Sequence, residues 1–247
     1  MASGDPTDDH GATCGCPEPA VPWSRRRLLW TALTGTAAGL VAGTGGSSFL
    51  MPAPAHAQST ADPDATLKML LDGNQRFIAR RLTFLEKDLE ILRQKTVDKQ
   101  QPLAAVLSCA DSRVPVELIF DQTLNRVFVA RIAGNIATPE IIASIEYGVA
   151  VLGIRLILVL GHAGCGAVKA AMSATVAPGQ ITGLYRHLSP AVAVSGGNLE
   201  ATIKENAKIQ AEALSGSPVV EAGLKAGTLK LVPAYYDLGT GRVSLLT

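Results

Sequence analysis

Two short apolar runs, each followed by candidate metal ligands, constrain the fold of this chain more than any other feature. The first run, 103–107, ends two residues before Cys109, and the second, 156–160, is followed by His162 and Cys165. Continuous apolar runs of this length are typical of strands buried inside a parallel sheet. Open α/β sheets carry their sites at the carboxyl ends of the strands, so two such strands lying side by side would bring the three side chains together.

The ligand set comprises two thiols and one imidazole, and its size predicts the kind of metal site. A structural zinc normally has four protein ligands, whereas a catalytic zinc has three and leaves the fourth position for water or substrate. A disulfide between Cys109 and Cys165 is the structural alternative. The metal is favoured because His162 stands three residues before Cys165 and because a disulfide leaves the neighbouring Asp111 and Arg113 without a role.

Strand and helix patterns alternate beyond residue 100. We predict strands at 103–108, 126–132, 155–160 and 229–236, and an edge strand at 242–246. We predict helices at 114–120, 138–153, from 164 onward, at 200–214 and at 218–226, with short helical pieces in a loop over 175–197. This order predicts an α/β fold with a central, mostly parallel sheet, an antiparallel edge strand and flanking helices. A Rossmann domain is the competitor, but no Gly-x-Gly-x-x-Gly opens a helix here.

Composition bounds the partners of the chain. Its 247 residues, 47% of them hydrophobic, are enough for one α/β domain with a substantial core. The formal net charge of +1 gives no electrostatic attraction to nucleic acid or to an anionic membrane. Only 4% of residues are aromatic, which also disfavours a surface for stacking bases. We therefore expect no nucleic acid as a partner.

Residues 1–57 have the features of an export signal. Consecutive arginines, Arg25 to Arg27, precede an apolar segment rich in Ala, Gly and Thr over 28–50, and Ala55-His56-Ala57 offers a cleavage site. A transmembrane anchor is the alternative, because the segment approaches the length that spans a bilayer. The small-residue end favours cleavage after Ala57. We expect a twin-arginine type of export, a periplasmic or extracellular location and no stable membrane anchor.

Residues 58–99 are predicted to form a helical arm ahead of a core at 100–247. Asp62-Pro63-Asp64 is a helix start, and apolar residues at helical spacing continue to about Arg81. A second amphipathic helix carries Leu85, Leu89 and Leu92 and reaches about Lys99. The two apolar faces must pack against the core or against a second subunit.

The motifs together resemble those of the β-class carbonic anhydrases. Cys-x-Asp-Ser-Arg stands at 109–113, His-x-x-Cys at 162–165, and Arg-Ile-Ala-Gly-Asn lies between them at 131–135. The resemblance extends over 67–246 and includes the closing hairpin around 234–237. It implies the β-carbonic anhydrase fold and reversible hydration of carbon dioxide to bicarbonate and a proton, with one Zn²⁺ per subunit.

The resemblance also implies a role for each residue near the metal. Cys109, His162 and Cys165 would bind Zn²⁺, and hydroxide on the metal would attack carbon dioxide. Asp111 would accept a hydrogen bond from that hydroxide, and Arg113 would hold Asp111 in place. In a closed form known in the family, Asp111 becomes the fourth zinc ligand. An ordinary loop salt bridge is the alternative for this pair.

Four further residues match the family's substrate pocket. Gln100 resembles the amide that donates a hydrogen bond to substrate, and Gly166 resembles the glycine beside the last ligand. Phe128 and Tyr147 align with aromatic walls that come from the partner subunit in the family. Core packing explains Phe128 on a strand and Tyr147 in a helix nearly as well. The family's unit is a dimer embraced by N-terminal helices, so we expect a homodimer or a tetramer.

Regulation and proton transfer are less constrained. A regulated bacterial subgroup has a tryptophan where this chain has Val106, which favours the constitutively open subgroup although Arg131 is present. His187, beside Arg186, is a candidate proton shuttle, but solvated surface is the simpler interpretation. Two other functions stay open: hydrolysis of carbon disulfide or carbonyl sulfide on the same zinc, and a non-catalytic zinc module.

Overall fold

The structure of the chain is a computed structural model that describes residues 61–83, 94 and 96–247. The predicted export signal, 1–57, lies outside the described residues, as does most of the predicted second helix of the arm. None of the helices in the described part of the chain combines the length and apolar character needed to span a membrane.

A five-stranded sheet forms the centre of the molecule. Its strands are β1 (Ala104–Ser108), β2 (Val127–Arg131), β3 (Leu156–His162), β4 (Lys230–Tyr236) and β5 (Val243–Leu245). Their order is β2-β1-β3-β4-β5. The first four are parallel, and β5 runs antiparallel to β4. The predicted fold class is therefore confirmed, including the antiparallel edge strand.

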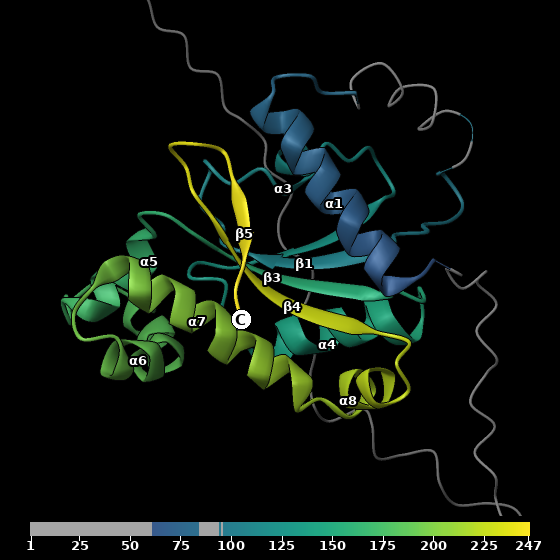
Figure 1. Cartoon of the computed structure of the whole chain (residues 1–247). Coiled ribbons are helices and arrows are strands. Elements are labelled where there is room, and N and C mark those ends of the chain that lie inside the picture. The colour runs from purple at the N-terminus through teal and green to yellow at the C-terminus, as the bar shows by residue number, and fades with distance from the viewer. Residues whose placement is uncertain (1–60, 84–93, 95) are drawn as a thin grey trace, which may run out of the picture. The chain divides into compact units, whose positions relative to one another are not determined.

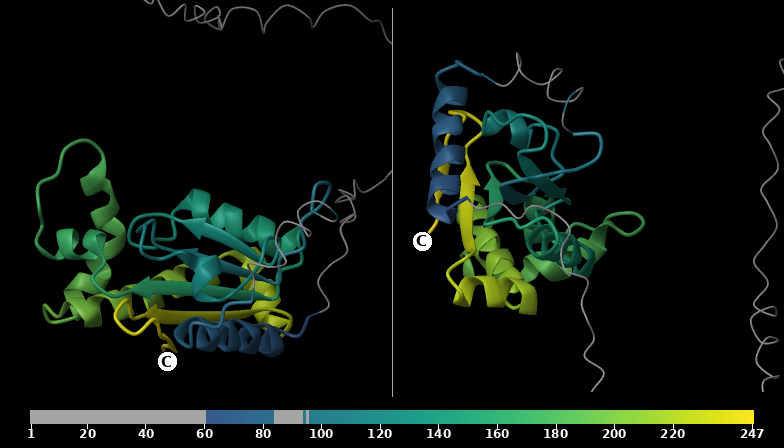
Figure 2. Two further views of the ribbon diagram at one scale, coloured as in Figure 1. Left: turned by 90° about the horizontal axis from the view of Figure 1, so that it is seen from above. Right: turned by 90° about the vertical axis from the view of Figure 1, so that its right-hand side faces the viewer.

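Helices cover both faces of this sheet. They are α1 (Pro63–Ile78), α3 (Val116–Ile119), α4 (Pro139–Ala150), α5 (Gly166–Met172), the short 3₁₀ helix η1 (Ile181–Leu184), α6 (Tyr185–Val194), α7 (Leu199–Ser215) and α8 (Pro218–Lys225). Figure 1 shows α1 on one side of the sheet and α4, α7 and α8 on the other. Helices α5 and α6 lie beyond one end of the strands (Figure 2).

The two apolar runs become the central strands because both of their faces are covered. Every residue of β1 and of β3 is buried. Val106 and Leu158 belong to the cluster beneath α1 and α3, whereas Leu107 and Val159 belong to the cluster beneath α4 and α7. A strand buried on both sides needs apolar residues at every position, so its sequence does not alternate.

Helix α1 packs against the core of its own chain. The carboxylate of Asp62 caps it by accepting a hydrogen bond from Ala65 N at 2.9 Å. Leu67 and Leu70 are buried in the first core cluster. Of the two partners expected for its apolar face, the core or a second subunit, the structure shows the core. The helix ends at Ile78, earlier than the predicted Arg81.

Strand β3 is longer than its apolar run predicts. We predicted a strand over 155–160, but β3 continues through Gly161 to His162, its last residue. The physical reason is the partner strand, since Tyr235 and Tyr236 of β4 pair with Gly161 and His162. A parallel ladder continues as long as both strands offer backbone groups, whatever the hydropathy of one of them.

Candidate metal centre

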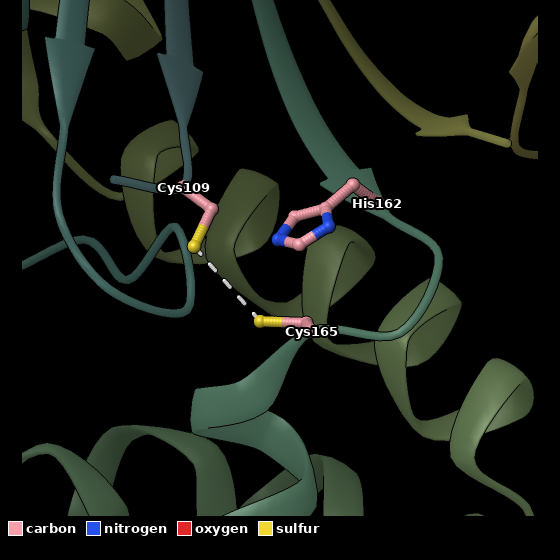
Figure 3. A group of neighbouring side chains, drawn as sticks. All are labelled: Cys109, His162 and Cys165. Atoms are coloured by element: carbon pink, nitrogen blue, oxygen red, sulfur yellow. Dashed lines mark hydrogen bonds between the residues drawn. The ribbon is translucent and has the colours of Figure 1, made fainter. Parts of the chain in front are cut away.

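Three elements bring the candidate ligands to the carboxyl end of the sheet. Cys109 follows β1 directly, His162 ends β3, and Cys165 is the N-cap residue of α5. Strands β1 and β3 are neighbours, with Ser108 opposite Leu160, so the loops that follow them start side by side. Figure 3 shows the three side chains pointing toward one another. The prediction that these residues converge is confirmed.

The distances between the ligand atoms fit a zinc ion. The Sγ atoms of Cys109 and Cys165 are 3.9 Å apart, and no disulfide joins these two residues. The two sulfurs and one imidazole nitrogen of His162 lie within 4.8 Å of one another. Two Zn–S bonds of about 2.3 Å at a tetrahedral angle separate the sulfurs by about 3.8 Å. A tetrahedral zinc therefore fits between them without rearrangement of the loops.

His162 presents one nitrogen to this space. Its side chain is fully buried. Nδ1 lies 3.0 Å from the carbonyl oxygen of Ala163, and because a carbonyl only accepts, Nδ1 is the atom that donates a proton. Nε2 is buried and has no hydrogen-bond partner among the described residues. A backbone acceptor on one nitrogen and a free lone pair on the other is the arrangement found in metal-binding histidines.

The two thiols have opposite pKa shifts. The hydrogen bond from Cys165 lowers the pKa of Cys109 to about 4, although burial opposes this effect. The same hydrogen bond, with burial, raises the pKa of Cys165. Without a cation the pair thus holds one proton between two sulfurs. A divalent ion replaces that proton and allows both groups to be thiolates, which makes metal binding by the pair pH-dependent.

Asp111 and Arg113 form a bidentate ion pair beside the ligands. Arg113 Nη2 lies 2.7 Å from Asp111 Oδ2, and Arg113 Nε lies 3.0 Å from Oδ1. The hydrogen bond from Arg113 holds the pKa of Asp111 well below its usual range. Asp111 Oδ2 is 3.9 Å from His162 Nε2. An ionised carboxylate that can only accept hydrogen bonds therefore stands next to the ligand nitrogen.

The backbone of the first ligand loop is fixed by two groups that sequence reasoning did not assign. Arg131 donates from Nε to Cys109 O at 2.9 Å and from Nη2 to Asp111 O at 2.6 Å. Gly134 N donates to the sulfur of Cys109 at 3.3 Å. Both residues belong to the motif at 131–135, which was therefore a usable signal. Its function is to hold the loop that carries Cys109 and Asp111.

The predicted substrate residues divide into two places. Gly166 is the first residue of α5, next to Cys165. Gln100 and Tyr147 instead line a cavity of about 310 Å³ together with residues 96–99 and Leu152. Phe128 does not line this cavity. It packs against α4, since a Cβ added at Gly148 would lie 3.7 Å from the Phe128 ring.

This cavity is distant from the metal ligands of the same chain. All five residues of β1 lie between Gln100 and Cys109, a length of about 16 Å at about 3.3 Å per residue. The cavity is lined by no metal ligand. The structure thus groups Gln100 with Tyr147 but does not bring either of them to the Cys109 loop of its own chain.

The two remaining candidates lie elsewhere in the fold. Val106 is fully buried in β1. His187 lies on α6, and its Nε2 accepts a hydrogen bond from Arg186 Nε at 3.1 Å. The role of His187 as a proton shuttle stays a prediction.

Known proteins share this architecture. The family model for carbonic anhydrases matches residues 104–243. The chain is 37% identical over 197 residues to a carbonic anhydrase of Mycolicibacterium smegmatis, which covers 75% of this chain and 94% of the relative. The solved β-carbonic anhydrase CcaA is similar with a TM-score of 0.59 and 26% identity, covering 73% of this chain and 95% of that one. A Coccomyxa β-carbonic anhydrase in complex with acetazolamide gives a TM-score of 0.57 at 28% identity, covering 73% and 86%.

The matched region contains the three ligands, the Asp111–Arg113 pair and the motif at 131–135. The fold of the solved relatives has the parallel sheet and flanking helices described above. On these grounds the chain belongs to the carbonic anhydrase family, in its β class.

Proposed function

We propose that this protein catalyses the zinc-dependent, reversible hydration of carbon dioxide. The observation that carries the proposal is the ionised carboxylate of Asp111 beside a set of three buried ligands, a set that leaves one zinc position for a reactant. When bound, the zinc would lower the pKa of a water molecule and so supply a nucleophile near neutral pH. Cys109, His162 and Cys165 would hold the ion.

The residues around the ligands would orient the reactants. Asp111 accepts a hydrogen bond from the attacking water, which aims an oxygen lone pair at the carbon of carbon dioxide. Arg113 keeps the carboxylate in that orientation through two parallel hydrogen bonds. One carbon–oxygen bond forms, one carbon–oxygen double bond opens to a single bond, and one proton leaves to buffer. The products are bicarbonate and a proton.

The proposal is tested on the chain that begins at Gln58. We expect one zinc per chain and carbon dioxide hydration that is fastest above neutral pH. Two thiolates place more negative charge on the zinc than three imidazoles do, so the pKa of the bound water should be higher. Cys109→Ala, His162→Ala and Cys165→Ala should each lose the metal and the activity together. Zinc analysis and stopped-flow hydration with a pH indicator measure both quantities. Full zinc occupancy without hydration would overturn the proposal.

Two other functions are separated by the same preparation. Carbon disulfide and carbonyl sulfide are linear like carbon dioxide, so a sulfide-release assay run beside the hydration assay distinguishes hydrolysis of these compounds. A non-catalytic zinc module would give no turnover in either assay. The bidentate Asp111–Arg113 pair supports a catalytic site, because it holds an ionised carboxylate 3.9 Å from the candidate ligand nitrogen of His162.

The complete substrate pocket is proposed to need two copies of the chain. Gln100, Phe128 and Tyr147 match the family's pocket, yet the cavity beside Gln100 and Tyr147 is remote from the zinc ligands of its own chain. Both facts are accounted for if one protomer supplies this wall to the zinc of its partner. We therefore propose a homodimer, with a tetramer as a further stage of assembly.

The location of the protein is also a proposal. The arginine run and the Ala55-His56-Ala57 site support export followed by cleavage after Ala57. N-terminal sequencing of the protein recovered from outside the cytoplasm should begin at Gln58. Replacing Arg25, Arg26 and Arg27 by Lys should leave the full-length chain in the cytoplasm. Recovery of the intact chain in the membrane fraction would favour the anchor instead.

A further inference from the structure

We propose that Asn206 is a positioning residue of the metal centre, acting through the backbone of Gly134 on the sulfur of Cys109. The inference rests on the proposed zinc site. It concerns a helix that contributes no ligand and a residue that lies outside the motifs at 109–113, 131–135 and 162–165.

The connection consists of two hydrogen bonds on either side of one glycine. Gly134 N donates to Cys109 Sγ at 3.3 Å, and Gly134 O accepts from Asn206 Nδ2 at 2.9 Å. Gly134 has a φ of +79°, in the left-handed region that other residues rarely adopt. A turn hydrogen bond from Asn135 N to Ile132 O at 2.9 Å closes the loop from within, and a contact from outside the loop fixes the outer carbonyl of Gly134. Asn206 is the side chain that donates a hydrogen bond to the carbonyl oxygen of Gly134, on the peptide that follows the glycine.

A second amide on the same helix face supports Asn206. Gln210, one turn further along α7, donates from Nε2 to Asn206 Oδ1 at 3.0 Å and accepts from Ala137 N at 2.8 Å. Asn206 is 1% exposed and Gln210 is 3% exposed. The amides thus fix the loop 134–137 at both of its ends. Since the orientation of the Asn206 amide is set by Gln210, its nitrogen faces the carbonyl of Gly134.

The sulfur of Cys109 depends on this loop. A backbone N–H that donates to a thiolate draws negative charge from the sulfur and fixes its direction, and such outer partners tune the metal that the ligand holds. Cys165 is different, because α5 begins directly after it and presents its first backbone N–H groups there. The bond to Cys109 comes from a separate loop, so its geometry depends on what anchors that loop.

A purely structural role for Asn206 makes a different prediction, and the chain offers a matched control. Asn74 on α1 is also 1% exposed and also bonds backbone groups, donating to Ile119 O and Gly241 O and accepting from Val243 N. None of these partners bonds Gly134 or Cys109. Asn74→Ala therefore removes comparable buried hydrogen bonds without affecting the contact between Gly134 and Cys109.

The experiment compares Asn206→Ala with Asn74→Ala in two measurements that do not depend on turnover. Competition with a chelator gives the zinc affinity, and cobalt substitution gives the energy of the thiolate-to-metal charge-transfer band. We expect Asn206→Ala to bind zinc about tenfold more weakly or worse. Its charge-transfer band should move to longer wavelength, because a sulfur without the N–H donor gives up an electron more easily. Asn74→Ala should keep the wild-type affinity and band.

The outcomes separate the inference from the proposed function. Equal zinc affinity and equal bands in folded Asn206→Ala and wild type would overturn the inference alone. A wild-type protein that binds no zinc through these ligands would overturn the proposed function and the inference with it. If Asn206→Ala does not fold, Gln210→Met removes the donor that orients Asn206. That variant should weaken zinc binding in the same direction, and a wild-type value would count against the role of Asn206.

Discussion

At the scale of single residues, Asp111 carries the most specific prediction. Asp111→Asn keeps the size of the side chain but changes one acceptor oxygen into a donor. We expect hydration to fall about 100-fold, because the group that orients the attacking water is lost, while zinc stays bound. The depressed pKa of Asp111 means that the wild-type carboxylate is already ionised above about pH 5, so the loss should not vary with pH above that value.

The control for this variant is its zinc content. A metal-loaded Asp111→Asn protein that turns over at the wild-type rate would remove Asp111 from the mechanism. Stopped-flow hydration between pH 6 and pH 9 is the measurement.

Asp121 predicts a pH dependence of stability rather than of activity. It lies after α3 and accepts hydrogen bonds from Arg76 Nε, Thr83 N and Thr83 Oγ1, so it ties the chain beyond α1 to the core. Burial raises the pKa of this carboxyl, but the hydrogen bonds from Arg76 and Thr83 outweigh burial and leave the pKa below its usual value. A depressed folded pKa stabilises the protein above the unfolded pKa, about 3.9, and this contribution is lost as pH falls below it.

Asp121→Asn should therefore lower the free energy of unfolding by about 2 kcal/mol at pH 7. The difference from wild type should shrink near pH 3. Urea unfolding of zinc-free, reduced protein at both pH values measures it. Asp72→Asn is the control, because Asp72 and its partner Lys68 are both exposed and their pair contributes about 0.5 kcal/mol or less. A difference that persists unchanged at pH 3 would contradict this reading of Asp121.

At the scale of elements, the docking of α1 depends on one glycine. A Cβ atom at Gly73 would lie 1.8 Å from the carbonyl oxygen of Phe120, which is backbone and cannot rotate away. Alanine normally stabilises a helix interior by about 1 kcal/mol relative to glycine. Here the clash outweighs the helix propensity of alanine. We expect Gly73→Ala to lower the free energy of unfolding by about 2 kcal/mol or more, because α1 must move off the core.

Gly183→Ala is the matched substitution, since a Cβ there meets nothing within 4 Å. We expect its midpoint of thermal unfolding to equal that of wild type, while that of Gly73→Ala falls. If Gly73→Ala were as stable as wild type, the close approach of α1 to Phe120 would not exist in solution.

At the scale of the whole molecule, the proposed shared site predicts complementation between two inactive chains. His162→Ala lacks zinc but keeps the wall around Gln100 and Tyr147. The double variant Gln100→Ala, Tyr147→Ala keeps zinc but lacks that wall. Random mixing of protomers gives half mixed dimers with one complete site in each, so about a quarter of wild-type activity should return.

Coexpression of the two chains, assayed before the dimers are separated, measures this recovery. Purification through separate tags then isolates the mixed dimers, which should have about half of the wild-type activity, since one of their two sites is complete. The control is a mixture of the separately folded proteins without exchange, which should regain nothing. If coexpression restores no activity although mixed dimers form, the wall and the zinc do not meet between subunits.

Much of this molecule was determined by local sequence pattern. The apolar runs at 103–107 and 156–160 identified the central strands, since a strand covered on both faces is apolar at every position. The short spacing within 109–113 and 162–165 identified the candidate ligands, because residues so near in sequence lie at the same end of one strand. The order of strands and helices then implied the parallel sheet and the end at which the site would form.

Only the tertiary structure decided the contacts between distant segments. The length of β3 depended on pairing with β4, and the covering of α1 depended on a core assembled from the rest of the chain. Asn206 is 72 residues from Gly134, and no local pattern couples them. The placement of Gln100 away from its own Cys109 likewise required the strand between them to be fixed in space. The sequence pattern indicates which apolar side chains each segment can bury. Hydrogen bonds between distant segments depend on where those segments pack in the folded chain.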